Sequence, residues 1–161
     1  MAASLSVRVY TGAGPTESGA VTGIDLISAD NATNTLANRQ ANPITVGNNS
    51  YEKWLKLKID TIPANAVTNF QIWGDGAVMT STTLRFTTAY ITYQVGTTAT
   101  STIANTTFTN FTAGNKATWD STSYTNTNAT TKFTVFQLVV DSTAGPGNWT
   151  QETISYSYDE T

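Results

Sequence analysis

The chain has 161 residues, a formal net charge of −3, and neither histidine nor cysteine. Charged residues make up only 12% of the sequence, whereas thirty-three residues are threonine, which is β-branched and favours strands over helices. Without histidine and cysteine the chain lacks the commonest general acid/base and metal ligand and the strongest ready nucleophile. A weakly acidic chain also has no electrostatic footprint for DNA or RNA. The composition therefore favours a β-rich scaffold or binding surface over an enzyme.

The length fits one domain of ordinary size. Surface scaling predicts that about 69% of the unfolded surface is buried on folding, which provides a core without disulfides or a structural metal. No window approaches the ~20 apolar residues of a membrane span, so we expect no membrane partner. The first ten residues already alternate like a strand and show no signal-peptide pattern, so we expect synthesis in the cytoplasm.

In the first third of the chain, alternating apolar and polar residues predict strands between loops rich in Gly, Pro, Asn and Thr. Leu5, Val7 and Val9 mark a first strand, which ends in the Gly/Pro-rich residues 12–15. We expect residues 30–50 to form a long connection. The further strands predicted here are residues 21–29 and a short one over 44–46.

Residues 51–60 give the clearest strand pattern. One face carries Tyr51, Lys53, Leu55, Leu57 and Ile59, and the other carries Glu52, Trp54, Lys56, Lys58 and Asp60. One largely apolar face and one charged face are typical of an antiparallel sheet with a solvated side.

The remaining elements follow the same period of two residues. Residues 67–73 and 82–95 are predicted strands, and Gly74-Asp75-Gly76 between them indicates a tight hairpin. Residues 97–131 are dominated by Thr and Asn and are expected to form long loops with short strands. The apolar run 132–141 predicts a central strand, residues 145–147 a turn, and 149–158 the last strand.

These segments predict the fold class. We expect an all-β protein in which residues 1–161 form a single antiparallel β-sandwich domain, jelly-roll-like, with eight or nine strands. Residues 1–15 could extend from it as an N-terminal arm.

Few residues are candidates for catalysis or metal binding. Five lysines could replace histidine as a base, but none stands in a Ser-x-x-Lys pattern, and lysines on strand faces typically solubilise sheets. The eleven acidic residues leave a glycosidase open by composition. However, the aspartates at predicted strand ends are typical turn formers. Residues 30–34 cluster several oxygen ligands but lack the acidic density of a calcium loop. We therefore expect no catalytic residues, no metal and no cofactor.

Trp54 has three interpretations. On the charged face of its strand, beside Lys56 and Lys58, its ring could stack on a sugar. It could equally be covered by a neighbouring subunit, because tryptophan is enriched at interfaces. Alternatively, both faces of the strand are partly buried within a sandwich.

The chain resembles capsid decoration (cement) proteins of tailed bacteriophages. The resemblance lies in the acidic, Thr/Asn-rich, all-β profile and in short phrases spread along the chain. These phrases are Tyr51-Glu52-Lys53-Trp54-Leu55-Lys56-Leu57, Asn69-Phe70-Gln71-Ile72-Trp73 and Thr153-Ile154-Ser155-Tyr156-Ser157-Tyr158-Asp159-Glu160. The resemblance implies a non-enzymatic β-sandwich on the outer surface of a virion, made in the host cytoplasm. It further implies that the protein binds and stabilises the major capsid protein shell as a homo-oligomer, with a trimer favoured.

Two other functions remain open. A tail, fibre or receptor-binding module of a virion would also use a jelly roll. A carbohydrate-binding module would use the tryptophans at positions 54, 73, 119 and 149.

Two parts of the chain are candidate interfaces with other subunits. The first is the N-terminal segment with Leu5, Val7, Val9 and Tyr10, because a terminal strand can add to the edge of a neighbour's sheet. The second is the charged strand face with Trp54, Lys56 and Lys58.

Overall fold

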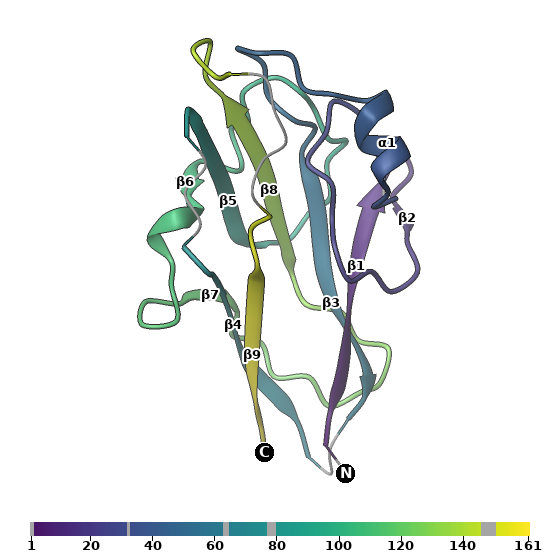
Figure 1. Cartoon of the computed structure of the whole chain (residues 1–161). Helices are drawn as coiled ribbons and strands as arrows, with labels where there is room; N and C mark the ends of the chain where they lie inside the picture. The colour runs from purple at the N-terminus through teal and green to yellow at the C-terminus, as the bar shows by residue number, and fades with distance from the viewer. Residues whose placement is uncertain (1, 32, 63–64, 77–79, 146–150) are drawn as a thin grey trace.

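Within the described residues, the protein is a β-sandwich of nine strands in two antiparallel sheets (Figure 1). The computed structural model describes residues 2–31, 33–62, 65–76, 80–145 and 151–161. The sequence prediction of an all-β sandwich with eight or nine antiparallel strands is confirmed.

Six strands form the larger sheet. Their spatial order is β2 (Thr16–Glu17), β1 (Ser4–Thr11), β3 (Lys53–Thr61), β8 (Phe133–Val140), β5 (Thr82–Tyr90) and β6 (Thr106–Thr107). The central position predicted for the apolar run 132–141 is confirmed, because β8 lies between β3 and β5. The outermost strands, β2 and β6, have only two residues each.

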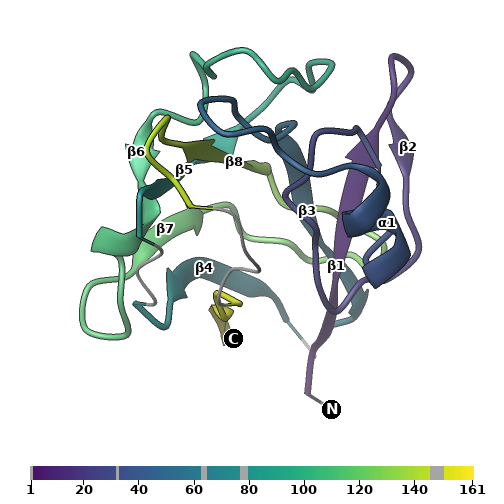
Figure 2. The same cartoon turned by 45° about the horizontal axis from the view of Figure 1, so that its top comes forward.

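Three strands form the smaller sheet, in the order β7 (Ala117–Asp120), β4 (Val67–Gly74) and β9 (Ile154–Glu160). In Figure 2, β7, β4 and β9 of the smaller sheet lie below β5 and β8 of the larger sheet. The main core lies between these layers. Leu57 and Ile59 of β3 point into it, and so do Phe70 and Ile72 of β4, all with 0% exposure. Alternation along each strand therefore buries one face of each sheet.

A β-bulge keeps β4 in this arrangement. The register with β9 shifts between Thr68 and Gln71, and Asn69 between them has a φ of 53°. Asparagine tolerates this left-handed conformation better than most residues. The extra residue lets Val67 and Phe70, which are three residues apart, both face the core.

Consecutive long strands lie in opposite sheets. From β3 onward the chain passes through β4, β5, β7, β8 and β9, and each step crosses between the layers. The hairpin predicted at Gly74-Asp75-Gly76 is therefore wrong, because β4 and β5 do not pair. Gly74 instead packs so closely on Phe108 that a Cβ would lie 2.9 Å from the phenyl ring, and its N–H donates to the Phe111 carbonyl at 3.0 Å.

The first 50 residues differ most from the sequence prediction. Residues 21–29 make a single bridge, Val21 to Val7, instead of a strand, and residues 44–46 form no strand. Helix α1 (Leu36–Ala41) was not predicted, because none of its residues is buried and it has no apolar stripe. Thr35 caps this helix by accepting the Asn38 N–H at 3.2 Å.

In the remaining chain the predicted strand over 82–95 ends at Tyr90, and the last strand begins at Ile154 rather than at residue 149. Residues 97–131 contain two short strands and a 3-10 helix η1 (Phe108–Asn110) between loops, as predicted. The predicted turn at 145–147 and Trp149 lie outside the described residues, except for Gly145.

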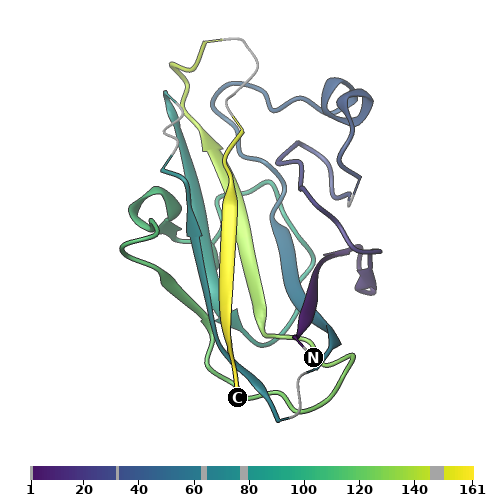
Figure 3. The ribbon, with the colours of Figure 1, turned by 60° about the horizontal axis from the view of Figure 1, so that its bottom comes forward.

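The two chain ends meet at one end of the sandwich, which Figure 3 brings forward. The Ala3 N–H donates to the Glu160 carboxylate at 2.9 Å, and the Tyr158 hydroxyl donates to the Ala3 carbonyl at 3.1 Å. Residues 4–11 are strand β1, paired with β3 from Ser4 to Tyr10. The N-terminal segment is thus part of the sheet, and the expectation of an extended arm over 1–15 is corrected.

Candidate interface on the outer face of the large sheet

The structure divides the predicted interface residues between two faces. Leu5, Val7 and Val9 point into the sandwich, where Val9 is 1% exposed and the other two are half-buried against the main core. Tyr10, Trp54, Lys56 and Lys58 lie on the outer face, where register pairs Tyr10 with Trp54. The three aliphatic residues are therefore not brought together with the charged strand face.

Trp54 is 0% exposed, so of its three interpretations the structure agrees with the burial of both faces of the strand within the sandwich. Its indole packs among Phe133, Tyr90 and Tyr93, with ring centroids 5.2 to 5.6 Å apart. Ala104 and Ile103 complete this second hydrophobic cluster. The segment after β5 covers the ring, so both faces of β3 are buried here. Stacking of a sugar on Trp54 is excluded in this conformation.

Buried hydrogen bonds fix this covering segment, residues 91–105, to the sheet. The Gln137 side chain donates to the carbonyls of Ala99 and Thr97 at 2.7 and 3.3 Å. Its oxygen accepts the Ser101 N–H at 2.9 Å. The Ser101 hydroxyl in turn donates to the Glu52 carboxylate. Because buried polar groups are costly when unpaired, this network holds the segment in one position.

Beyond the cover, three cations lie on adjacent strands of the outer face. We call Arg8, Lys56 and Lys58 the cationic ladder. Arg8 stands directly opposite Lys56 in the pairing of β1 with β3, and Lys58 is two residues further along β3 on the same face. The Arg8 and Lys58 side chains are 16% and 25% exposed, so both are partly buried and partly accessible to a partner.

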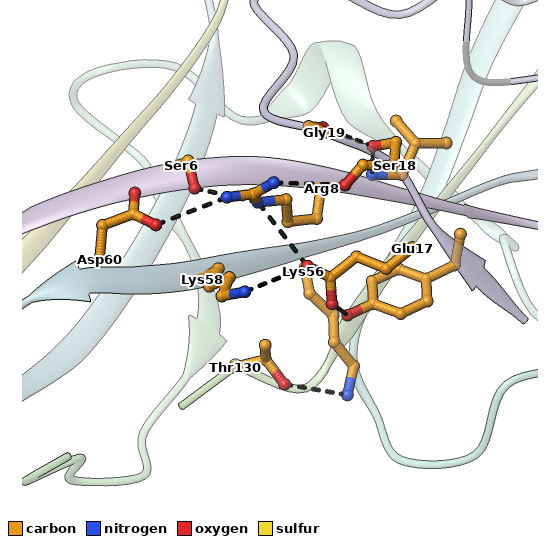
Figure 4. A network of polar contacts seen from close by, with 11 residues as sticks. Ser6, Arg8, Glu17, Ser18, Gly19, Lys56, Lys58, Asp60 and Thr130 are labelled. Atoms are coloured by element: carbon orange, nitrogen blue, oxygen red, sulfur yellow. Dashed lines mark hydrogen bonds and ion pairs between the residues drawn. The ribbon is translucent and has the colours of Figure 1, made fainter. Parts of the chain in front are cut away.

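Two carboxylates hold the ladder in place (Figure 4). Glu17 of β2 lies 3.8 Å from the Arg8 Nε and 3.5 Å from the Lys58 Nζ. Asp60 lies 3.5 Å from the Arg8 guanidinium. Three cations against two anions leave the patch with a local excess of one positive charge, in a chain whose net charge is −3.

Lys56 and Tyr10 link the ladder to the aromatic cluster. The Lys56 ammonium lies 4.2 Å from the centroid of the Phe133 ring and bonds to the Thr130 hydroxyl at 3.4 Å. Burial lowers the pKa of Lys56. The Tyr10 hydroxyl donates to Glu17 at 2.7 Å, and this hydrogen bond lowers the pKa of the Glu17 carboxyl. The ladder is therefore preorganised before any partner binds.

The remaining candidate residues have structural roles. Trp119 is 1% exposed and its indole N–H donates to the Lys132 carbonyl at 3.0 Å. Trp73 is half-buried on the outer face of the small sheet, where the Lys116 ammonium lies 4.3 Å from the ring centroid. Trp149 lies outside the described residues. Of the tryptophans that the structure describes, only Trp73 remains available for a sugar.

Polar groups of the loop at residues 30–34 are used within the protein. The Asp30 carboxylate accepts the Gly12 N–H at 2.8 Å, and the Asn31 side chain accepts the Thr33 N–H. These are turn and loop contacts. Across the described ranges, no three His, Cys, Asp or Glu side chains cluster as metal ligands would. No helix in those ranges has the length and apolarity of a membrane span.

The sequence-based prediction did not identify a buried lysine. Lys53 is 1% exposed, and its ammonium donates to the carbonyls of Ala29 and Asn31 at 3.0 and 2.6 Å. Burial lowers its pKa to about 8, although Asp30 and Asp25 act in the opposite direction. The signal was present in the sequence, because Lys53 shares the apolar face of its strand with Leu55 and Leu57. Lys53 fastens the irregular segment that precedes α1 to the large sheet.

Comparison of the chain with known protein families, with curated proteins and with solved structures finds no match.

Proposed function

We propose that the protein is a non-enzymatic structural component of a tailed-phage virion, a decoration protein that binds the outer surface of the major capsid shell. The observation that carries the proposal is the cationic ladder, a preorganised group of three cations on an acidic, threonine-rich chain. The partner class comes from the resemblance to decoration proteins. The ladder supplies N–H donors for carboxylates and carbonyls of another protein surface.

Individually weak contacts are enough to stabilise a capsid shell. A protein that binds only the assembled shell stabilises it by mass action, and many copies act on one particle. Because the ladder is at the surface, its attraction to an acidic partner is screened by salt. We therefore expect binding to weaken as ionic strength rises.

The test mixes the purified protein with undecorated shells and measures co-sedimentation and the melting temperature of the shell. We expect co-sedimentation, a higher shell melting temperature and a loss of affinity of about tenfold or more in Lys58→Glu. Lys116→Glu, on the opposite sheet, is the matched control and should bind like the wild type. Absence of both co-sedimentation and shell stabilisation by the wild type would overturn the proposal. Labelling of tails instead of shells would assign the protein to the tail or fibre.

A second candidate is a carbohydrate-binding module, for which Trp73 is the candidate among the tryptophans that the structure describes. The ring lies on a polar sheet face beside Ser155, its register partner on β9, with Gln71 and Thr118 paired on the same face. A partly exposed indole among hydroxyl and amide groups suits stacking on a sugar. A glycan array and tryptophan fluorescence of the wild type and Trp73→Ala test this. A signal present only in the wild type would favour it over capsid binding.

A further inference from the structure

One sheet edge is much longer than the others. The large sheet ends in the two-residue strands β2 and β6, and the small sheet ends in the four-residue β7 on one side. On the other side it ends in the seven-residue β9, which contains neither proline nor lysine. Natural sheets usually shorten or block such edges, because a long open edge pairs with other strands.

The backbone pattern identifies which groups of β9 are open. Thr161 and Ala66 exchange two hydrogen bonds at 3.0 and 3.1 Å, and the Thr153 carbonyl accepts the Asp75 N–H at 3.1 Å. The odd-numbered residues of β9 therefore point their N–H and C=O groups toward β4. By the alternation of an antiparallel ladder, those of Ile154, Tyr156 and Tyr158 point away. No residue in the described ranges makes a backbone hydrogen bond to these groups.

The opposite layer extends beyond this edge. Six strands face three, and the Tyr158 hydroxyl reaches Ala3 at the start of β1, so the vacant strand position beside β9 lies over β1. In Figure 2, β9 is seen almost end-on with β4 as its neighbour in the small sheet. The inward side chains Leu5 and Val7 of β1 remain half-buried. A further strand beside β9 would complete the cover over them.

We propose that β9 of a second copy of this chain fills that position, antiparallel to the first β9, and forms a dimer with twofold symmetry. The strand is self-complementary, because its inward residues Ile154, Tyr156 and Tyr158 are apolar or aromatic and its outward residues 155 and 157 are serines. Such a pairing is isologous, with the same surface used on both copies. The two small sheets then join into one six-stranded sheet.

Strand overlap and charge together select the register, because only an axis at Ser157, the midpoint of Ile154–Glu160, pairs all seven residues of β9. With the twofold axis at Ser157, Tyr156 stands opposite the partner's Tyr158, and Asp159 stands opposite the partner's Ser155. No acid then faces an acid. With the axis at Tyr156, Glu160 would face the partner's Glu152, and like charges directly opposite destabilise a strand pair. A parallel pairing would place the acidic ends of both strands together. This dimer differs from the trimer that the resemblance implies. Its formation does not depend on binding to a capsid.

A single cysteine tests both the pairing and its register. Ser157 would form a pair without backbone hydrogen bonds, with its Cα about 4.5 Å from that of its counterpart, which is within disulfide range. The chain has no cysteine of its own. We expect Ser157→Cys to form a disulfide-linked dimer rapidly under mild oxidation. Ser155→Cys, about 13 Å from its counterpart along the strands, and Thr118→Cys on the distant β7 should stay monomeric in denaturing gels.

Light scattering after size exclusion gives an independent measurement. The wild type should elute as a dimer, and Ser157→Lys, which places two ammonium groups opposite each other on a solvated face, as a monomer with an unchanged circular dichroism spectrum. Thr118→Lys is the matched control and should remain a dimer. A monomeric or trimeric wild type would overturn the proposal, as would equal cross-linking rates for Ser157→Cys and Thr118→Cys. Equal rates for Ser155→Cys and Ser157→Cys would refute the register.

Discussion

The stability of this protein should rise between about pH 7 and about pH 9.5, because of Lys53. The pKa of this lysine falls from 10.5 to about 8 in the folded state, since the buried ammonium has lost its hydration. Between these two pKa values the unfolded chain binds more protons than the folded one. The free energy of unfolding therefore increases as pH rises through this range.

The size of the effect follows from the shift. At ~1.4 kcal/mol per pKa unit, a shift from 10.5 to about 8 disfavours the folded protein by about 3 kcal/mol well below pH 8. About 2 kcal/mol of this is recovered between about pH 7 and about pH 9.5. For a domain of this length that corresponds to a rise in melting temperature of about 4–8 °C.

Urea unfolding followed by tryptophan fluorescence at several pH values measures this effect. Measurements stop below pH 10, because burial raises the pKa of Tyr93 to about 12, and ionisation of such tyrosines in the unfolded chain lowers stability above that pH. Lys53→Met should remove most of the rise and leave the smaller contribution of Lys56, whose pKa is also lowered by burial, whereas Lys58→Met should retain the full rise. A flat wild-type profile, or the same rise in Lys53→Met, would refute the role assigned to Lys53.

Two further predictions concern buried groups. Burial alone would raise the pKa of Asp120, but hydrogen bonds from the backbone N–H groups of Lys132 and Thr122 and from the Tyr124 hydroxyl lower it to about 2. Stability should therefore fall as pH drops from about 4 to about 2. Asp120→Asn should lose about 2 kcal/mol at pH 7 and remove this fall at low pH, as measured in urea titrations. Trp54→Ala should cost about 3–5 kcal/mol in the same titrations, because its ring is fully enclosed; a cost below about 1 kcal/mol would contradict that enclosure.

The long strands could be predicted from the sequence because their signal is local. In β3, and in β4 from Phe70 onward, the inward side chains recur at every second residue, whatever the rest of the chain does. The Gly74-Asp75-Gly76 signal is also local, but it is the same for a strand that turns back in its own sheet and for one that crosses to the other. Whether the chain turns back or crosses depends on contacts of Gly74 with Phe108 and Phe111, which are far away in sequence.

The candidate interface was predicted only in part for the same reason. The outward direction of Lys56 and Lys58 follows from alternation, but the burial of Trp54 depends on residues 91–105, whose Thr/Ala-rich sequence has no periodic pattern. Helix α1 had no signal either. It is held by polar contacts such as the ion pair of Arg39 with Asp25 at 2.9 Å, which join it to a loop.

The crossing of the chain between the two sheets has a consequence for how the protein forms. Strand β3 pairs with residues 4–10 on one side and with residues 134–136 on the other, and β4 pairs with 117–120 and 154–160. Almost no long strand can pair with its neighbour in sequence, so large loops must close before the sheets gain stability. Folding should take milliseconds to seconds rather than microseconds. During synthesis, one edge of β3 and one edge of β4 therefore stay unpaired until the last quarter of the chain leaves the ribosome.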